Sequence, residues 1–191
     1  MGHLICAQEA HAQLALDVVV LVPMGQAPHR EIARDPGAEV RARLCEYVVA
    51  PDDRLDLARV EVDRPGPSYT VDTLRILRER SPEDELTLIL GADQAARLPS
   101  WREPEGVLSL ATVAVAARGG LEHEAVQRQL DGLAGSERIA FFDMPRVDIS
   151  STLVRERAAA GRPIRYLVPD KVADYVQAKG LYGATVPVSA E

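Results

Sequence analysis

The 191-residue chain has few cysteines, no excess of basic residues and no long apolar run, and each shortage excludes a class of protein. Its two cysteines, Cys6 and Cys45, lie far apart and outside any Cys-x-x-Cys pair, which is typical neither of a disulfide framework nor of a zinc site. The formal net charge of −7 argues against a broad nucleic-acid interface, because such an interface needs clustered lysine and arginine. A small phosphate ligand held by a few local donors remains compatible with this charge.

No apolar run approaches the roughly 18 residues that a membrane helix needs. The N-terminus has no basic segment followed by an apolar one, so we expect neither a signal peptide nor a membrane partner. Together with the cysteine usage, this predicts a cytoplasmic protein. With 47% apolar residues, the chain can bury one substantial core, which predicts a single domain over residues 1–182 and a disordered tail over 183–191.

Five short, continuous apolar runs alternate with segments of helical period. The runs are 18–23, 57–62, 86–91, 111–117 and 138–145, and the helical segments are 38–49, 71–80, 122–133, 152–160 and 171–179. Continuous runs are typical of strands that are buried on both faces. The alternation predicts an α/β fold with a doubly wound, Rossmann-like parallel sheet. Ligands bind such sheets beyond the carboxyl ends of the strands, so candidate residues follow the runs.

The stretch "RVDISSTLVRER" follows the fifth run and puts three hydroxyls, those of Ser150, Ser151 and Thr152, at a helix start. Several backbone N–H groups there lack an intrahelical partner, and an ordinary cap with a spare serine is one interpretation. Arg155 and Arg157 argue for another, because the helix dipole disfavours cations near its N-terminus by about 0.3–1 kcal/mol each. A bound anion would reverse that effect, so we predict a phosphate site.

The stretch "RPGPSYTVDTLRIL" follows the second run and predicts a turn and then a helix. Thr70 is the predicted N-cap, with Asp72 in the first turn, and local structure alone explains both residues. Local structure does not explain Tyr69, which falls on a loop at the edge of the expected crevice.

The stretches after the third and first runs add five candidates. Gly91, in "LILGADQAARLPSW", allows a ligand to approach the backbone, and Asp93 either holds a ribose or caps a helix. Trp101 is the only tryptophan, and it serves either as core or as a stacking platform on a Pro-flanked loop. His29 and Arg30, in "VPMGQAPHREIARD", either face the ligand or belong to a solvated loop.

Taken together, these stretches resemble the bacterial nicotinate-nucleotide adenylyltransferases, which belong to the nucleotidyltransferase superfamily marked by His-x-Gly-His. Five motifs match in order and spacing: "PSYTVDTL" (67–74), "LILGAD" (88–93), "LPSW" (98–101), "DISSTLVR" (148–155) and "IRYLVPDKVADYV" (164–176). The Ser-Ser-Thr-x-x-Arg element also occurs in phosphopantetheine adenylyltransferases, whereas "PSYTVDT" and "LPSW" favour the pyridine-nucleotide branch.

The match begins at Gly2-His3, the last two positions of the His-x-Gly-His signature. The central strand, the Gly-Gly-Thr-Phe-Asp-Pro loop and the first histidine of the family have no counterpart in the chain. The resemblance therefore implies a sheet that lacks its first, central strand and its phosphate loop. We expect the natural protein to start upstream of Met1 and the chain as given to be poorly active, or to be a non-catalytic nucleotide-binding module.

The resemblance implies transfer of AMP from ATP to nicotinate mononucleotide, which gives nicotinate adenine dinucleotide and pyrophosphate in NAD biosynthesis. His3 would donate to the phosphates near the reacting centre, and Ser150, Ser151, Thr152 and Arg155 would hold the outgoing phosphates. Mg²⁺ would bridge phosphate oxygens, with water and substrate as its main ligands. A phosphopantetheine adenylyltransferase-like enzyme is the alternative within the same superfamily.

The same resemblance assigns residues to the two nucleotides. Gly91 and Asp93 would pack against ATP, with Asp93 near the ribose. Trp101 would stack on the pyridine ring, and the loop at Tyr69-Thr70 would present donors to the ring carboxylate. His29 and Arg30 would form a lid over the phosphates. Leu181 and Tyr182 could serve a core or an interface, so a homo-oligomer stays open.

Overall fold

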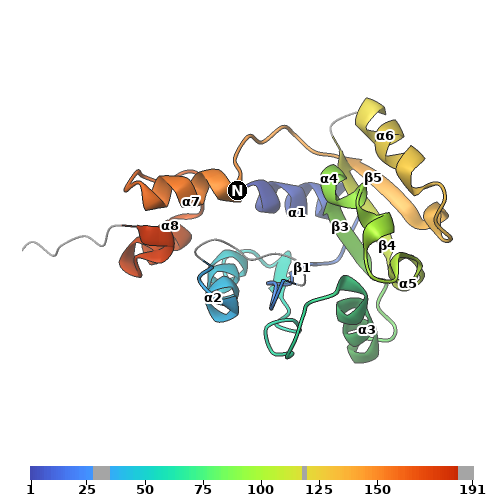
Figure 1. The fold of residues 1–191 in the computed structure, drawn as a ribbon, viewed down its shortest axis with the longest axis horizontal. Helices are drawn as coiled ribbons and strands as arrows, with labels where there is room; N and C mark the ends of the chain where they lie inside the picture. Colours follow the sequence, from blue (N-terminus) through green and yellow to red (C-terminus); the bar gives the residue numbers. More distant parts are fainter. Residues whose placement is uncertain (28–34, 118–119, 185–191) are drawn as a thin grey trace, which may run out of the picture. The chain divides into compact units, whose positions relative to one another are not determined.

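The computed structural model describes residues 1–27, 35–117 and 120–184, which fall into two units, each with its own strands and core (Figure 1). Unit 1 contains residues 1–3, 18–67 and the chain from 147 onward, and unit 2 contains residues 4–17 and 68–146. Every strand ladder in the described ranges is parallel, which confirms the predicted α/β class. The predicted single sheet is divided into two among these residues. The strands β1 and β2 form one sheet, and β3, β4 and β5 form the other.

The sheet of unit 2 has the strand order β3–β4–β5. Its strands are β3 (Thr87–Gly91), β4 (Thr112–Ala117) and β5 (Ile139–Asp143). All three lie within predicted apolar runs, and Val113 at the centre pairs with both Leu88 and Ile139.

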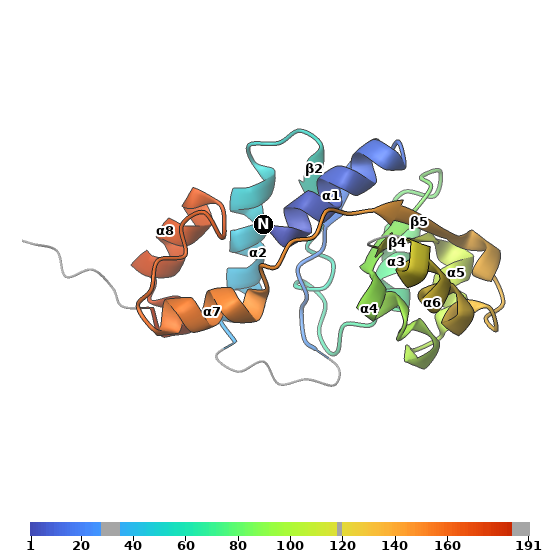
Figure 2. The same ribbon diagram turned by 90° about the horizontal axis from the view of Figure 1, so that it is seen from above.

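Side chains of β4 alternate between two cores on opposite faces of this sheet. Val113 and Val115 belong to a core that is completed by α3 (Thr70–Arg80), α5 (Pro104–Leu110) and α6 (Gly120–Leu130), and Figure 2 shows α5 and α6 beside β4. Ala114 and Ala116 face the other way, onto α1 (Gly2–Gln13). Alanine on both sides, with Ala10 fully buried, lets this helix approach the sheet closely. Helices on both faces explain why the strands are continuously apolar.

The side-chain amide of Gln13, at the end of α1, binds the last residue of β5. Its Nε2 donates to the Asp143 carbonyl at 2.7 Å, and its Oε1 accepts from the Asp143 N–H at 3.0 Å. In the described ranges β5 pairs with β4 alone, so its outer edge has no strand partner. The amide takes the place of such a partner at one residue.

We expect Gln13→Ala to lower the free energy of unfolding by about 1 kcal/mol, because two backbone groups of Asp143 lose their partner where water can partly replace it. Gln127→Ala is the matched control, since among the described residues its amide binds only a side chain, that of Asp131 just after α6. That change should cost less than about 0.5 kcal/mol. Urea denaturation measures both values, and equal losses would show that the contact with β5 contributes nothing particular.

Unit 1 contains a two-stranded ladder of β1 (Val19–Leu21) and β2 (Leu55–Leu57). The strand predicted over 57–62 is wrong beyond its first residue. After Leu57 the chain turns, and the Arg59 carbonyl accepts from the N–H of Asp63 at 2.9 Å. Val60 is nevertheless 3% exposed. The apolar pattern therefore reports a buried turn.

Three helices and a short 3₁₀ turn form the apolar core of unit 1. They are α2 (Ala38–Val49), α7 (Ser151–Ala159), α8 (Asp170–Ala178) and η3 (Leu181–Gly183). The predicted helices 38–49, 152–160 and 171–179 are confirmed to within one residue, and Figure 1 shows α7 and α8 together. Leu181 and Tyr182 pack against this core, so they give no argument for an interface.

The sequence does not predict several short elements of the structure. The helices α4 (Ala92–Ala95) and α5 and the 3₁₀ turns η1 (Leu98–Ser100) and η2 (Ser136–Arg138) are too short to show a clear period. In the predicted tail, Ala184 packs against the unit 1 core, and residues 185–191 lie outside the described ranges. No helix in the described part of the chain is long and apolar enough to cross a membrane.

Candidate functional site

The predicted site residues form two groups, one in each unit. Unit 1 contains His3, Ser150, Ser151, Thr152 and Arg155, and unit 2 contains Tyr69, Thr70, Gly91, Asp93 and Trp101. The predicted lid residues His29 and Arg30 lie outside the described residues.

In unit 1, Ser150 caps α7: its Oγ accepts from the N–H of Leu153 at 3.0 Å. The ordinary-cap interpretation is therefore right for this serine. Ser151 and Thr152 form the first turn, and both are exposed, as is Leu153. The start of α7 is thus open to solvent, and a helix start of this kind can accept an anion.

Arg155 lies one turn into α7, beside these hydroxyls. Its Nη2 donates to the Oγ1 of Thr152 at 3.4 Å, and no carboxylate among the described residues lies within ion-pair distance. Burial raises the pKa of the Tyr182 phenol above its usual value, and the nearby charge of Arg155 opposes that rise. A guanidinium next to hydroxyls and free backbone N–H groups is suited to binding phosphate oxygens.

Arg157 does not belong to this group. It lies in the last turn of α7, where its Nε and Nη2 donate to the carbonyl of Pro163 at 3.0 and 2.9 Å. The helix dipole favours a cation at that end. The prediction that two cations crowd the helix start is therefore wrong for Arg157, because α7 has nine residues and ends shortly after it.

The start of α1 lies beside the start of α7. A Cβ added at Gly2 would lie 3.6 Å from the carbonyl oxygen of Ile149, the residue before the cap. The N-terminal amino group donates to the Leu167 carbonyl at 3.4 Å. His3, in the first turn of α1, is exposed. Unit 1 therefore brings the Gly2-His3 pair to the serine-rich turn.

Arg41 on α2 is a further cation that acts on Tyr182, as Arg155 does, and sequence reasoning missed it. Its Nε donates to the Met24 carbonyl at 2.9 Å and its Nη2 to the Gly25 carbonyl at 2.6 Å, and it pairs with Asp35. These contacts hold the backbone that follows β1. Its charge also reaches the Tyr182 phenol, as that of Arg155 does. No local signal marks Arg41, because the helical pattern of 38–49 makes it one more surface cation.

In unit 2, α3 begins at Thr70, after the extended residue Tyr69, and no side chain caps it. The prediction of Thr70 as N-cap is wrong, since Thr70 is itself the first helical residue. The Tyr69 carbonyl instead accepts from the N–H groups of Asp72 and Thr73, both at 3.1 Å. The first N–H groups of α3 thus have no side-chain acceptor and can bind a carboxylate.

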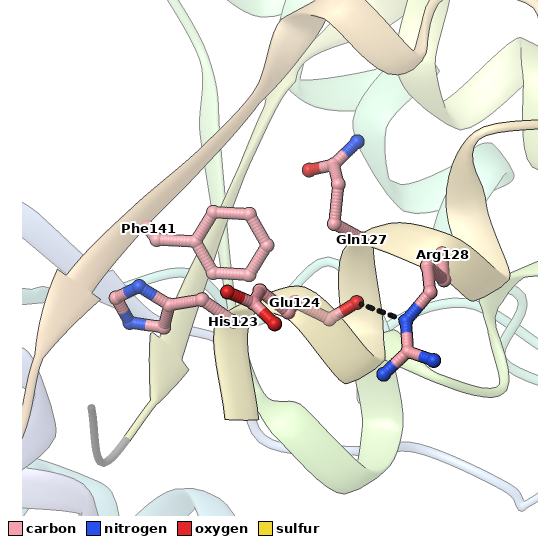
Figure 3. Close-up of a pocket in the computed structure, with 5 residues that line it drawn as sticks. All are labelled: His123, Glu124, Gln127, Arg128 and Phe141. Atoms are coloured by element: carbon pink, nitrogen blue, oxygen red, sulfur yellow. Dashed lines mark hydrogen bonds between the residues drawn. The ribbon is translucent and has the colours of Figure 1, made fainter. Parts of the chain in front are cut away.

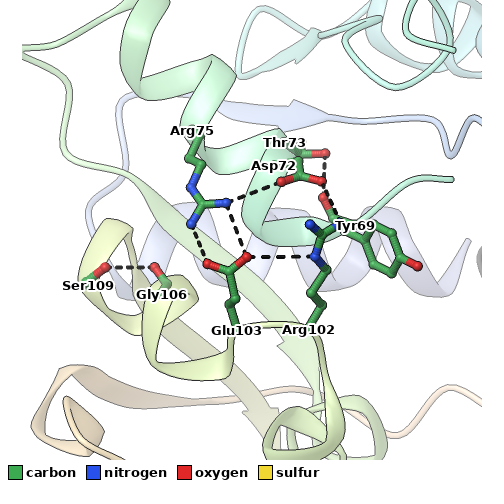
Figure 4. A network of polar contacts seen from close by, with 8 residues as sticks. All are labelled: Tyr69, Asp72, Thr73, Arg75, Arg102, Glu103, Gly106 and Ser109. Carbon is green, nitrogen blue, oxygen red and sulfur yellow. Dashed lines mark hydrogen bonds and ion pairs between the residues drawn. The ribbon is translucent and has the colours of Figure 1, made fainter. Parts of the chain in front are cut away.

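A polar network joins the start of α3 to the segment after Trp101 (Figure 4). The guanidinium of Arg102 lies 4.7 Å from the centre of the Tyr69 ring and 3.5 Å from the Asp72 carboxylate. Arg75 pairs with Asp72 at 3.3 Å and with Glu103 at 2.5 Å. The hydrogen bond from Arg75 lowers the pKa of the Glu103 carboxyl below its usual value.

Trp101 lies in extended backbone at the end of η1, and its N–H donates to the Leu98 carbonyl at 3.0 Å. Its side chain is half-buried and packs against the same apolar core as Tyr69. The two interpretations of Trp101, core and platform, are therefore compatible. A half-buried ring can pack against the core and still offer a surface for stacking.

Gly91 is the extended residue before α4. A Cβ at this position would lie 3.0 Å from the Oδ1 of Asp93, closer than an unstrained contact allows. The glycine therefore makes room for the Asp93 carboxylate, which is exposed and accepts from Gln94 at 3.2 Å.

An open hollow in unit 2 contains none of the predicted residues. It is lined by His123, Glu124, Gln127 and Arg128 of α6 and by Phe141 of β5 (Figure 3). The ring centroids of His123 and Phe141 lie 4.7 Å apart, so the imidazole packs on the aromatic ring. Within the described ranges, no group of three or more His, Cys, Asp or Glu side chains is arranged to hold a metal ion.

The chain is similar to known proteins along nearly its whole length. The family described as cytidylyltransferase-like matches residues 1–157. A probable nicotinate-nucleotide adenylyltransferase of Roseiflexus sp. (strain RS-1) is 41% identical over 183 residues, which cover 95% of this chain and 90% of that protein. One from Tropheryma whipplei (strain Twist) is 38% identical over 181 residues, which cover 95% and 92%.

Solved structures add support for the fold. Plasmodium falciparum nicotinic acid mononucleotide adenylyltransferase, complexed with NaAD, matches with a TM-score of 0.72 and 14% identity. The match covers 97% of this chain and 91% of that one. At this identity the likeness shows the fold, and it confirms the predicted Rossmann-like nucleotidyltransferase architecture.

Proposed function

The chain belongs to the nicotinate-nucleotide adenylyltransferase family and is a nucleotidyltransferase, and on this premise we propose that it transfers AMP from ATP to nicotinate mononucleotide. The products are nicotinate adenine dinucleotide and pyrophosphate, in NAD biosynthesis. The observation that carries the proposal is the open start of α7, where Arg155 lies beside exposed hydroxyls. We assign this activity to one nucleotidyltransferase domain over residues 1–182, in the cytoplasm, where free thiols such as Cys6 and Cys45 persist.

In the proposed reaction, a 5′-phosphate oxygen of the mononucleotide attacks the α-phosphorus of ATP in line. The bond between the α-phosphorus and the oxygen that bridges to the β-phosphorus breaks, and pyrophosphate leaves. No protein nucleophile is required, so catalysis consists of positioning and of neutralising charge on the phosphates. Ser151, Thr152 and Arg155 would hold the outgoing phosphates, with Ser150 setting the helix start, and His3 would donate near the α-phosphate.

A divalent metal ion generally accompanies ATP in such transfers and would neutralise charge on the phosphates. We propose Mg²⁺, which reaches the protein as part of the nucleotide substrate. The described residues offer no cluster of metal ligands, so phosphate oxygens and water would supply its coordination.

We assign the pyridine nucleotide to Tyr69, Thr70 and Trp101. The uncapped start of α3 supports the assignment, because its N–H groups suit the ring carboxylate. The half-buried Trp101 offers a flat surface for the pyridine ring, and Arg102 ties this segment to Tyr69. Asp93 would lie near the ATP ribose, and His29 and Arg30 stay assigned to a lid.

Gly91→Ala tests the role of Asp93. The added methyl group would displace the Asp93 carboxylate by a few tenths of an ångström, so we expect the KM for ATP to rise several-fold while the melting temperature stays unchanged. Gly132→Ala is the control, because a Cβ there has nothing within 4 Å. Steady-state kinetics with ATP as the varied substrate measures the change, and an unchanged KM would remove Asp93 from the ATP site.

The test of the proposed function is a transfer assay with ATP and each of three acceptors. Nicotinate mononucleotide should yield nicotinate adenine dinucleotide and pyrophosphate in equal amounts. Transfer to phosphopantetheine instead would identify the alternative enzyme. Binding of ATP without transfer to any acceptor would identify a non-catalytic module. Nicotinamide mononucleotide, as the third acceptor, measures the preference between acid and amide.

A further inference from the structure

Arg64 carries a guanidinium that no group among the described residues neutralises. It opens the stretch "RPGPSYT" in the loop between β2 and α3. Its Nη1 and Nη2 are both buried, and neither has a hydrogen-bond partner among the described residues. Buried polar groups are nearly always paired, so two orphaned nitrogens on one cation call for an explanation.

Asp63, the carboxylate next to Arg64 in the chain, is already engaged. Asp63, the preceding residue, pairs with Arg59 at 3.0 Å, and Arg59 also pairs with Glu39 at 2.9 Å. The loop itself is fixed without help from Arg64, because Gly66 has a φ of 82° and Pro67 bridges to Gln26. Arg64 therefore has neither an ion pair nor a turn to stabilise within the described part of the chain.

A buried, unpaired cation destabilises a protein, and a hydrophobic side chain of similar volume would be tolerated better there. Such a cation is useful when its partner is a ligand. The planar guanidinium presents two parallel N–H donors, which match the two oxygens of a carboxylate or phosphate.

We infer that Arg64 is a substrate-binding residue whose guanidinium pairs with an anionic group of the pyridine mononucleotide, either its 5′-phosphate or its ring carboxylate. The inference rests on the proposed function, and its chemistry is that of an oxyanion bound by a fork of N–H donors. The loop leads directly from Arg64 into Tyr69 and Thr70, the residues assigned to the same nucleotide.

The test compares Arg64→Met and Arg64→Lys with the wild-type chain. Arg59→Met serves as the control, an arginine of the same loop whose guanidinium has protein partners. KM is measured for ATP, nicotinate mononucleotide and nicotinamide mononucleotide, and the melting temperature is measured without nucleotide. We expect Arg64→Met to raise the KM for nicotinate mononucleotide at least about tenfold, since a charge-assisted pair is lost. The KM for ATP should change less than twofold, and the melting temperature should not fall.

The KM of Arg64→Lys for nicotinate mononucleotide should lie between those of the wild type and Arg64→Met. Lysine keeps the charge but lacks the two parallel N–H donors of the guanidinium. A weakened affinity for both mononucleotides identifies the 5′-phosphate as the partner, and a loss confined to the acid identifies the carboxylate. A lower melting temperature without nucleotide would overturn the inference, since it would reveal a structural partner. So would an unchanged KM for both mononucleotides, or a change in the KM for ATP alone. If the wild-type chain does not use nicotinate mononucleotide, the proposed function fails, and the inference fails with it.

Discussion

Replacing Arg155 with alanine is expected to lower the turnover of adenylyl transfer by about 100-fold or more, because the outgoing phosphates lose a preorganised cation. The guanidinium lies beside Thr152 at the open start of α7, with no carboxylate of the described chain to hold it elsewhere. Negative charge develops on the leaving pyrophosphate as its bond to the α-phosphorus breaks. A cation placed there stabilises the transition state more than the bound substrates, so kcat should fall more than KM rises.

Arg157→Ala is the matched control for this prediction. Arg157 lies on the same helix, but its donors are engaged by the Pro163 carbonyl. Its loss should lower stability by about 1–3 kcal/mol and leave turnover within about twofold. Steady-state rates of pyrophosphate release, compared well below the melting temperatures, separate the two effects. Turnover of Arg155→Ala close to that of the wild type would remove this residue from the site.

Long helices and central strands could be predicted from the sequence because their signals are local. The helix 38–49 has its predicted bounds, and the runs around β3, β4 and β5 are apolar because helices cover both faces of that sheet. The run 57–62 was misassigned because a buried turn and a short strand have the same composition. Periodicity reports burial, and the hydrogen-bond partner that distinguishes these cases lies elsewhere in the chain.

The candidate site also contains residues that the sequence marks and residues that it does not mark. Ser150, Thr152 and Arg155 could be found because they follow one another at a helix start. Arg41 and Arg64 could not, because their roles depend on contacts with distant residues or on the lack of such contacts. Arg41 reaches Met24 and Gly25, and the terminal nitrogens of Arg64 are buried without a partner among the described residues. A sequence shows that a cation is present, and only the fold shows whether its charge is already neutralised.

The second large effect is expected for substitution of Trp101, whose side chain is half-buried. We expect Trp101→Ala to raise the KM for nicotinate mononucleotide roughly tenfold or more, because stacking on an aromatic side chain contributes about 1–3 kcal/mol per base. The KM for ATP should change less than about twofold, since Trp101 packs in the same core as Tyr69 and the start of α3, which are assigned to the mononucleotide.

Trp101→Phe distinguishes stacking from packing. Both substitutions remove contacts with the apolar core of unit 2, so both should lower the melting temperature. Only phenylalanine keeps a flat ring, and it should recover most of the affinity for the mononucleotide. Kinetics for both substrates, with each variant held below its melting temperature, gives the comparison. Equal losses for ATP and the mononucleotide, or a phenylalanine variant as weak as alanine, would mean that the ring supports the core and does not bind the pyridine.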